Sequence, residues 1–169
     1  MKKFVALLLA CLMVFGLAAC GNNGDSQQTG EPANSNAPVA GGDKVVKIGV
    51  FEPQSGDNGA GGKQEILGMQ YANSLTPEVE INGETYKVEL VYADNQSAND
   101  KAPSAAQTLI SQGVSVVLGS YGSGVSIAAS DTFGDASVPA IGVTCTNPQV
   151  TAGNSHYFRI CFLDPFQGT

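Results

Sequence analysis

The run VSVVLG, residues 114–119, gives the strongest indication of the fold, because it is apolar throughout except for Ser115. An apolar run of this length is typical of a parallel strand that is covered on both faces. A helical pattern precedes it over residues 100–112 and stops at Gly113, and another follows over residues 125–133. The run therefore predicts a buried strand between two helices.

The same alternation of strands and helices continues in both directions from this run. Further runs predict strands over residues 45–51, 86–92, 139–143 and 157–162, a helix over residues 62–74 and a turn over residues 81–84. Alternation at this spacing requires right-handed crossovers between parallel strands. We therefore expect an α/β fold with a doubly wound, mostly parallel sheet.

The first 43 residues are predicted to direct the protein to its location rather than to fold. Two lysines precede an apolar run, residues 4–19, whose helical length of about 24 Å is short of the ~30 Å hydrocarbon core of a bilayer. The run leads into LAAC, which resembles the bacterial lipobox, so we expect residues 1–19 to be a lipoprotein signal peptide and Cys20 to carry the lipid anchor. Residues 20–43 are expected to form a flexible tether in front of a globular domain, residues 44–169. The alternative is an ordinary secretory signal with a chance cysteine.

Composition limits the partners and the chemistry of this domain. The chain has 8 basic and 15 acidic residues and a formal net charge of −7, which argues against nucleic acid as a partner. Cys145 and Cys161 are the only cysteines of the predicted domain, and the sequence leaves open whether they form a disulfide. No spacing of cysteine and histidine indicates a metal site.

The loops that follow the predicted strands are the expected place for a ligand, because open parallel sheets bind ligands outside the carboxyl ends of their strands. Three such loops, residues 54–62, 119–124 and 144–148, are rich in glycine and small hydroxyl side chains. Ser123 stands near the start of a helix, where free N–H groups and the helix dipole favour an anion such as a carboxylate. The alternative is that Ser123 is an ordinary N-cap.

Nucleotide-binding and catalytic motifs fail on spacing. Gln64 stands where a phosphate loop would need Ser or Thr and where a dinucleotide fingerprint would need Gly. His156 is the only histidine, no Gly-x-Ser-x-Gly elbow accompanies it, and it is interpreted as a strand-edge residue. Asp94 is expected to bond local backbone at a strand end, and Asp131 to be solvated on a helix face. The sequence predicts no catalytic residue, no metal site and no cofactor.

Several segments, taken in this order, resemble the branched-chain amino-acid (leucine/isoleucine/valine) substrate-binding proteins of ABC importers, which have the type I periplasmic-binding-protein fold. The segments are residues 48–56, 117–119, 121–123, 128–131, 138–143, 146–148, 157–159 and 164–168. The resemblance covers almost all of the predicted domain. It implies an extracytoplasmic protein, lipid-anchored in the bacterial cell envelope, that captures a small amino acid and delivers it to an ABC permease.

The resemblance also implies which residues bind the ligand. The α-carboxylate would be held by Ser123 and Thr146, and the ammonium group by the main-chain carbonyl of Thr144. Tyr121 and Gly122 would lie beside them. Two hydroxyl groups and neighbouring N–H groups can satisfy both oxygens of a carboxylate that leaves water.

The first loop differs from the family's pattern. Ser55 is expected to contribute to the ligand site from this loop. Gly61 stands where relatives often place an aromatic residue over the ligand, which leaves the preference among leucine, isoleucine and valine open.

Proteins of this family have two lobes that close around the ligand, and this chain is expected to be an N-terminal fragment that ends before the second lobe. We therefore expect an uncovered sheet edge or helix face. Two other functions stay open: the sensing ectodomain of a receptor, and an exported α/β enzyme. An amide or urea-type solute is an alternative ligand.

Overall fold

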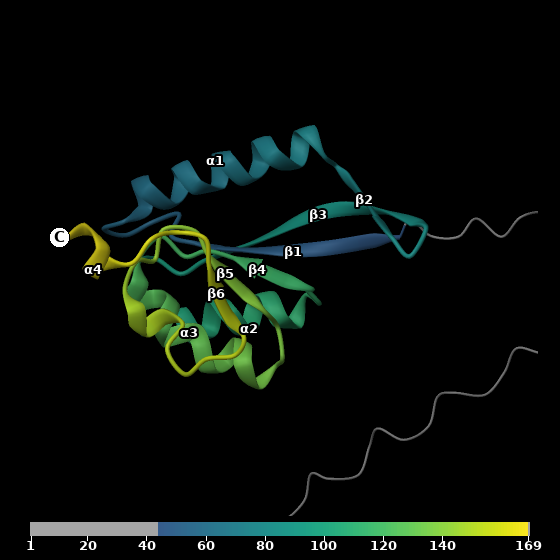
Figure 1. Ribbon diagram of the computed structural model, residues 1–169. Helices are drawn as coiled ribbons and strands as arrows, with labels where there is room; N and C mark the ends of the chain where they lie inside the picture. The colour runs from purple at the N-terminus through teal and green to yellow at the C-terminus, as the bar shows by residue number, and fades with distance from the viewer. Residues whose placement is uncertain (1–43, 169) are drawn as a thin grey trace, which may run out of the picture. The chain divides into compact units, whose positions relative to one another are not determined.

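The computed structural model describes residues 44–168 (Figure 1). The predicted signal peptide, the Cys20 anchor and the whole of the predicted tether lie outside the described residues. Within the described part, strands and helices alternate. The strands are β1 (Val45–Glu52), β2 (Glu78–Ile81), β3 (Glu84–Asp94), β4 (Val116–Leu118), β5 (Ala140–Gly142) and β6 (Tyr157–Arg159). The helices are α1 (Gly59–Leu75), α2 (Ala102–Ser111), α3 (Ser123–Asp135), the 3₁₀ turn η1 (Pro148–Val150) and α4 (Asp164–Gln167).

The six strands form one sheet in the order β2-β3-β1-β4-β5-β6, and every pair is parallel except β2 with β3. The register places Ile48 of β1 opposite Leu90 on one side and Val116 on the other. Helix α1 covers one face of the sheet, whereas α2 and α3 cover the other (Figure 1). The predicted doubly wound, mostly parallel sheet is confirmed.

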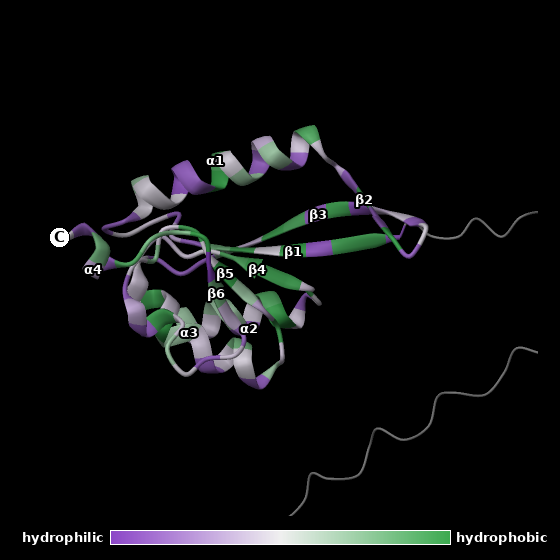
Figure 2. Cartoon of the chain, viewed as in Figure 1, coloured by the Kyte–Doolittle hydropathy of each residue, from purple (hydrophilic) through white to green (hydrophobic). Residues whose placement is uncertain are grey.

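The main core lies between the sheet and the helices α2 and α3. Phe51 of β1 and Phe133 of α3 are fully buried, and their rings meet edge to face with centroids 5.4 Å apart. Leu109 of α2 and Val117 of β4 are also fully buried in this cluster. Figure 2 shows the corresponding concentration of apolar residues in β1, β3 and β4. This core fixes β1 and β4 relative to α2 and α3.

Helix α1 is covered less completely than the other long helices. Leu67, Tyr71 and Leu75 are each more than 60% exposed. A largely apolar groove of about 730 Å³ runs between α1 and the sheet, and Ile160, at the far edge beyond β6, is 75% exposed. An exposed helix face, one of the two features expected, is therefore confirmed.

Strand β2 was not predicted from the sequence. All four of its residues are exposed, so no alternation of buried and exposed positions marks it as a strand. It pairs with β3 through a two-residue turn at Asn82 and Gly83, both of which have positive φ, as a type I′ hairpin requires. The predicted turn over residues 81–84 is thus confirmed as part of a hairpin.

Element boundaries differ from the predictions by a few residues. Helix α1 begins at Gly59 rather than at residue 62, and α3 begins at Ser123 rather than at residue 125. The polar and glycine-rich residues at both starts carry no apolar period that would reveal the first turn. His156 directly precedes β6, and Asp131 is exposed on α3, as predicted.

Candidate functional site

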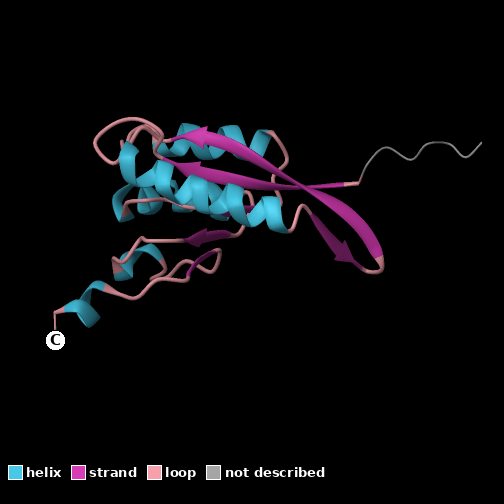
Figure 3. Cartoon of the chain, turned by 90° about the horizontal axis from the view of Figure 1, so that it is seen from above, coloured by secondary structure: helices cyan, strands magenta, loops and turns pink. Residues whose placement is uncertain are grey.

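The candidate site lies at one end of the sheet, where the carboxyl ends of the parallel strands meet their following loops. This end of the sheet is called the sheet edge. The arrowheads of these strands point toward one end of the molecule, where the connecting loops gather (Figure 3). The loop after β1, the loop after β4 and the segment after β5 all begin at this edge. The three glycine-rich loops that the sequence singled out are therefore neighbours in space.

Ser123 is the first residue of α3 and does not cap it. The N-cap residue is Gly122, whose φ of 117° lies in a region that glycine adopts most easily. The Ser123 hydroxyl instead accepts a hydrogen bond of 3.1 Å from the backbone N–H of Asn147, in the segment after β5. The N-cap alternative for Ser123 is therefore wrong, and two of the predicted ligand loops are joined at this bond.

Thr144 and Thr146 flank the buried Cys145 in the same segment. The side chain of Thr144 is exposed, and its hydroxyl group donates a hydrogen bond to Oε1 of Glu65 on α1. Thr146 is half-buried, and its carbonyl group accepts a 3.0 Å bond from the backbone of Asp164. The proposed role of the Thr144 carbonyl as the ammonium acceptor stays a prediction.

The segment after β5 owes its shape to Arg159, the only arginine of the sequence. Its guanidinium group donates to the carbonyl oxygens of Cys145 at 2.9 Å, Asn147 at 3.0 Å and Pro148 at 3.2 Å. It also donates to the hydroxyl of Thr151 at 2.8 Å. Sequence reasoning assigned no role to this residue, although a lone arginine in an acidic domain was a signal that could have been followed.

Ser55 is held by the carboxylate that ends β3. Its hydroxyl donates to Asp94 at 2.7 Å, and the backbone N–H groups of Gln54 and Gln96 each donate to the same carboxylate at 2.8 Å. Partial burial opposes ionisation, but these donors together hold the pKa of Asp94 below its ordinary value. Asp94 thus bonds local backbone, as predicted, and also fixes the first loop. Ligand contact by Ser55 stays a prediction.

Tyr121 connects the loop after β4 to the start of α1. Its ring lies so close to Gly61 that a Cβ atom there would be 2.5 Å from the ring. Its backbone N–H donates a 2.6 Å hydrogen bond to Oε2 of Glu52, the last residue of β1. Tyr121 is 37% exposed at the end of the sheet where the ligand is expected.

Sequence reasoning missed two fully buried polar side chains beneath this edge, Glu52 and Asn95. Asn95 donates a 2.8 Å hydrogen bond to the hydroxyl of Ser120, and its carbonyl oxygen accepts from the backbone of Ser97. Glu52 could have been noticed, since an acidic residue ends an otherwise apolar strand. Nothing in the sequence indicates that Asn95 is buried.

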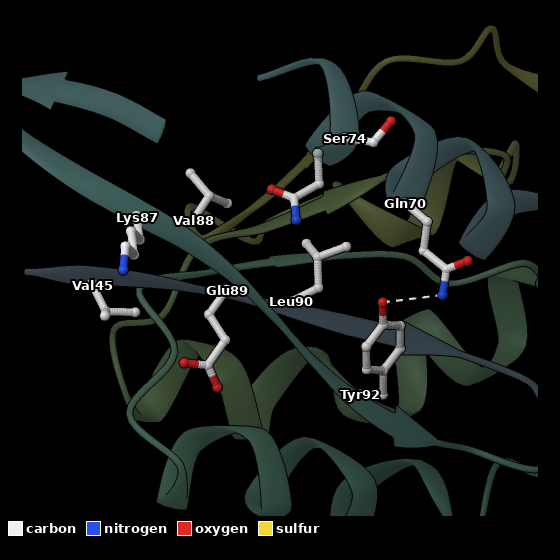
Figure 4. A pocket seen from close by; sticks show the side chains of 9 residues that line it. Val45, Gln70, Ser74, Lys87, Val88, Glu89, Leu90 and Tyr92 are labelled. Atoms are coloured by element: carbon white, nitrogen blue, oxygen red, sulfur yellow. Dashed lines mark hydrogen bonds between the residues drawn. The ribbon is translucent and has the colours of Figure 1, made fainter. Parts of the chain in front are cut away.

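A separate pocket of about 480 Å³ lies along β1 and β3. Figure 4 shows it between the later turns of α1 and these two strands. Gln70 donates a 3.2 Å hydrogen bond to the hydroxyl of Tyr92 at its side. Val45, the first residue of β1, also lines it, and none of the predicted ligand-binding residues does. It is not the candidate site.

Within residues 44–168, Cys145 and Cys161 are both free thiols, and burial is the main cause that raises the pKa of Cys145 to about 11. No group of three or more His, Cys, Asp or Glu side chains is placed to hold a metal ion in this part. None of the helices described here is both long and apolar enough to cross a membrane.

The fold and this edge define a class: α/β proteins with a small-molecule site outside the carboxyl ends of a parallel sheet. Residues 45–163 match the family described as periplasmic binding protein, and the chain belongs to this family.

Known relatives agree with this assignment. An amino acid binding protein of Pseudomonas aeruginosa is 38% identical over 126 residues, which cover 73% of this chain and 33% of the relative. The leucine binding protein LivK of Thermotoga maritima superposes with a TM-score of 0.67 at 36% identity, over 73% of this chain and 35% of that protein. LivJ of Streptococcus pneumoniae, solved in complex with isoleucine, gives a TM-score of 0.64 at 32% identity, over 72% and 35%.

The resemblance to branched-chain amino-acid binding proteins is therefore confirmed. The chain spans about a third of the length of these relatives.

Proposed function

We propose that this chain forms the N-terminal lobe of an extracytoplasmic solute-binding protein that captures a small amino acid and delivers it to an ABC permease. The observation that carries the proposal is the hydrogen bond from the Asn147 N–H to Ser123. It brings the first turn of α3 next to the residue that follows Thr146, at the sheet edge where such folds bind ligands.

The ligand's α-carboxylate would lie between the start of α3 and Thr146. The first N–H groups of a helix have no partner within the helix, and the helix dipole adds positive potential at the same place. With the hydroxyl groups of Ser123 and Thr146, these donors could satisfy both carboxylate oxygens, which would otherwise be costly to bury. The carbonyl of Thr144 would accept a bond from the ammonium group.

A branched-chain side chain is the favoured choice for the rest of the ligand. The names of the relatives support it, since one is a leucine binding protein and another was solved with isoleucine. Tyr121 supports it as well, because its partly exposed ring offers an apolar surface at the site. The remaining wall would come from a second lobe, and Cys20 would anchor the protein to the membrane by its lipid.

Amide chemical shifts measured by NMR test the location and the ligand together. One lobe leaves a face of the ligand in water, so affinity is expected to be weak, and chemical-shift titration detects weak binding. L-leucine, L-isoleucine and L-valine should shift the amides of residues 122–124 and 145–147, whereas D-leucine and urea should not. Shifts confined to the pocket around Tyr92 and Gln70, or none with any amino acid, would contradict the proposal.

A further inference from the structure

The carboxyl group of Glu52 lies inside the protein at the end of β1, with no exposed surface. Alternate residues of a strand point to opposite faces of a sheet. Phe51 packs on Phe133 of α3, so Glu52 points to the other face, which α1 covers. Glu65, in the second turn of α1, faces it there, and the two carboxyl groups lie within hydrogen-bonding reach of each other.

One oxygen of each carboxyl group has no hydrogen-bond donor among residues 44–168. These oxygens are Oε1 of Glu52 and Oε2 of Glu65, and both are buried. Two ionised carboxylates placed in this way would repel each other and leave both buried oxygens unsatisfied. A single proton between them removes the repulsion and makes the two oxygens partners in one hydrogen bond.

The other oxygen of each carboxyl group holds one of the proposed ligand loops. Oε2 of Glu52 accepts the 2.6 Å bond from the N–H of Tyr121, two residues before Ser123. Oε1 of Glu65 accepts the bond from the hydroxyl of Thr144. The pair therefore links the loop after β4 to the segment after β5 through the inner face of α1.

Arg159, the cation of this region, donates to main-chain carbonyl groups and to the hydroxyl of Thr151 rather than to the pair. Cys161 lies close to Cys145. Tyr157 of β6 and Cys145 after β5 are further titratable groups in this region, and Tyr157 donates to the carbonyl of Gly119. Burial raises the pKa of both groups, so they are neutral near neutral pH. Neither glutamate forms an ion pair with a basic side chain within the described part of the chain. Burial and then the Glu65 carboxyl raise the pKa of Glu52 far above its ordinary value.

We propose that Glu52 and Glu65 are a positioning pair, in which one shared proton couples the Tyr121 loop to Thr144 and keeps both in the geometry that binds solute. The coupling to solute rests on the proposed function. When the proton leaves, repulsion between the carboxylates separates α1 from the end of β1 and loosens both loops. Solute affinity should therefore fall at alkaline pH.

Infrared spectroscopy tests the proton without any ligand. A protonated carboxyl group has a carbonyl stretch distinct from that of a carboxylate, and the wild-type protein should show it near neutral pH. The band should disappear in Glu52→Gln and should be unchanged in the control Glu89→Gln, because Glu89 is exposed on β3. A wild-type spectrum without the band at neutral pH would overturn the proposal.

Solute affinity across pH tests the coupling. L-leucine affinity of the wild type should fall about tenfold or more between neutral pH and a pH above 10, where the pair loses its proton. Glutamine at position 52 can donate to Glu65 and accept from Tyr121. Above pH 10 the ammonium group of leucine also loses its proton, so both proteins should lose affinity, and the loss should be about tenfold or more greater in the wild type than in Glu52→Gln. An equal alkaline loss in both proteins would refute the coupling. Absence of all solute binding with the infrared band present would count against the proposed function and still support the shared proton.

Discussion

The ring of Tyr121 lies directly against Gly61, so the first turn of α1 presents no side chain where the loop after β4 presents an aromatic one. A Cβ atom at Gly61 would lie 2.5 Å from Cζ of the ring. Gly61, where the resemblance to the family leads one to expect an aromatic residue, is thus the position against which the Tyr121 ring packs. The aromatic surface at this edge comes from Tyr121, and Gly61 makes room for it.

Gly61→Ala should displace this ring at small cost to the fold, because Tyr121 is partly exposed and can move. We expect weaker L-leucine binding and a change in unfolding free energy of less than about 1 kcal/mol. Gly68→Ala is the matched control in the same helix, since nothing lies within 4 Å of the added methyl group. It should stabilise the protein by about 0.5–1 kcal/mol and leave binding unchanged. Thermal unfolding and titration calorimetry measure both effects, and unaltered binding in Gly61→Ala would remove Tyr121 from the site.

Ser123→Ala and Thr146→Ala should each weaken solute binding by on the order of 1–3 kcal/mol, because each leaves a carboxylate oxygen without a donor. Ser123→Ala also frees the N–H of Asn147 and should increase its hydrogen exchange. Ser104→Ala, on the exposed side of α2, serves as the control. Calorimetric titration with L-leucine gives the affinities. If both variants bind as tightly as the wild type, the carboxylate site lies elsewhere.

The general plan of this fold could be predicted because it depends on local patterns. The apolar run at residues 114–119 and its flanking helical periods suffice for a parallel sheet, and parallel strands bring their following loops to one edge. The contacts between loops could not be predicted in the same way. Arg159 and Cys145 are 14 residues apart, and the hydroxyl of Thr144 reaches Glu65 across 79 residues. Such contacts depend on side-chain directions that no hydrophobic period records.

Arg159→Lys should destabilise the segment after β5, although it preserves the charge. A lysine carries its three N–H donors on one nitrogen atom and cannot reach all three carbonyl groups and the Thr151 hydroxyl that the planar guanidinium reaches. We expect a loss of about 1–3 kcal/mol in unfolding free energy and faster hydrogen exchange over residues 145–151. Lys101→Arg, on the exposed start of α2, is the control. Urea denaturation and exchange mass spectrometry measure the two effects, and unchanged exchange in Arg159→Lys would contradict this role.

The raised pKa of Glu52 predicts how stability varies with pH. Its ordinary value is 4.5, and the folded protein keeps the proton to a much higher pH. Above the unfolded pKa, unfolding therefore releases a proton, so stability is greatest below it and falls as pH rises toward the folded value. The slope for one proton is about 1.4 kcal/mol per pH unit.

Glu52→Gln cannot release this proton. Between pH 5 and pH 9 its unfolding free energy should therefore fall less steeply than that of the wild type, and the two slopes should differ by up to about 1.4 kcal/mol per pH unit. Glu89→Gln removes an exposed carboxyl group of β3 and should retain the wild-type slope. Asp94→Asn separates a second contribution to the pH dependence. The pKa of Asp94 is lowered in the folded protein, so Asp94 stabilises the fold above its unfolded-state pKa, and this stabilisation is lost only as pH falls through its folded-state pKa. Urea denaturation at a series of pH values gives the slopes. Parallel curves for the wild type and Glu52→Gln over this range would mean that Glu52 is ionised in the folded protein.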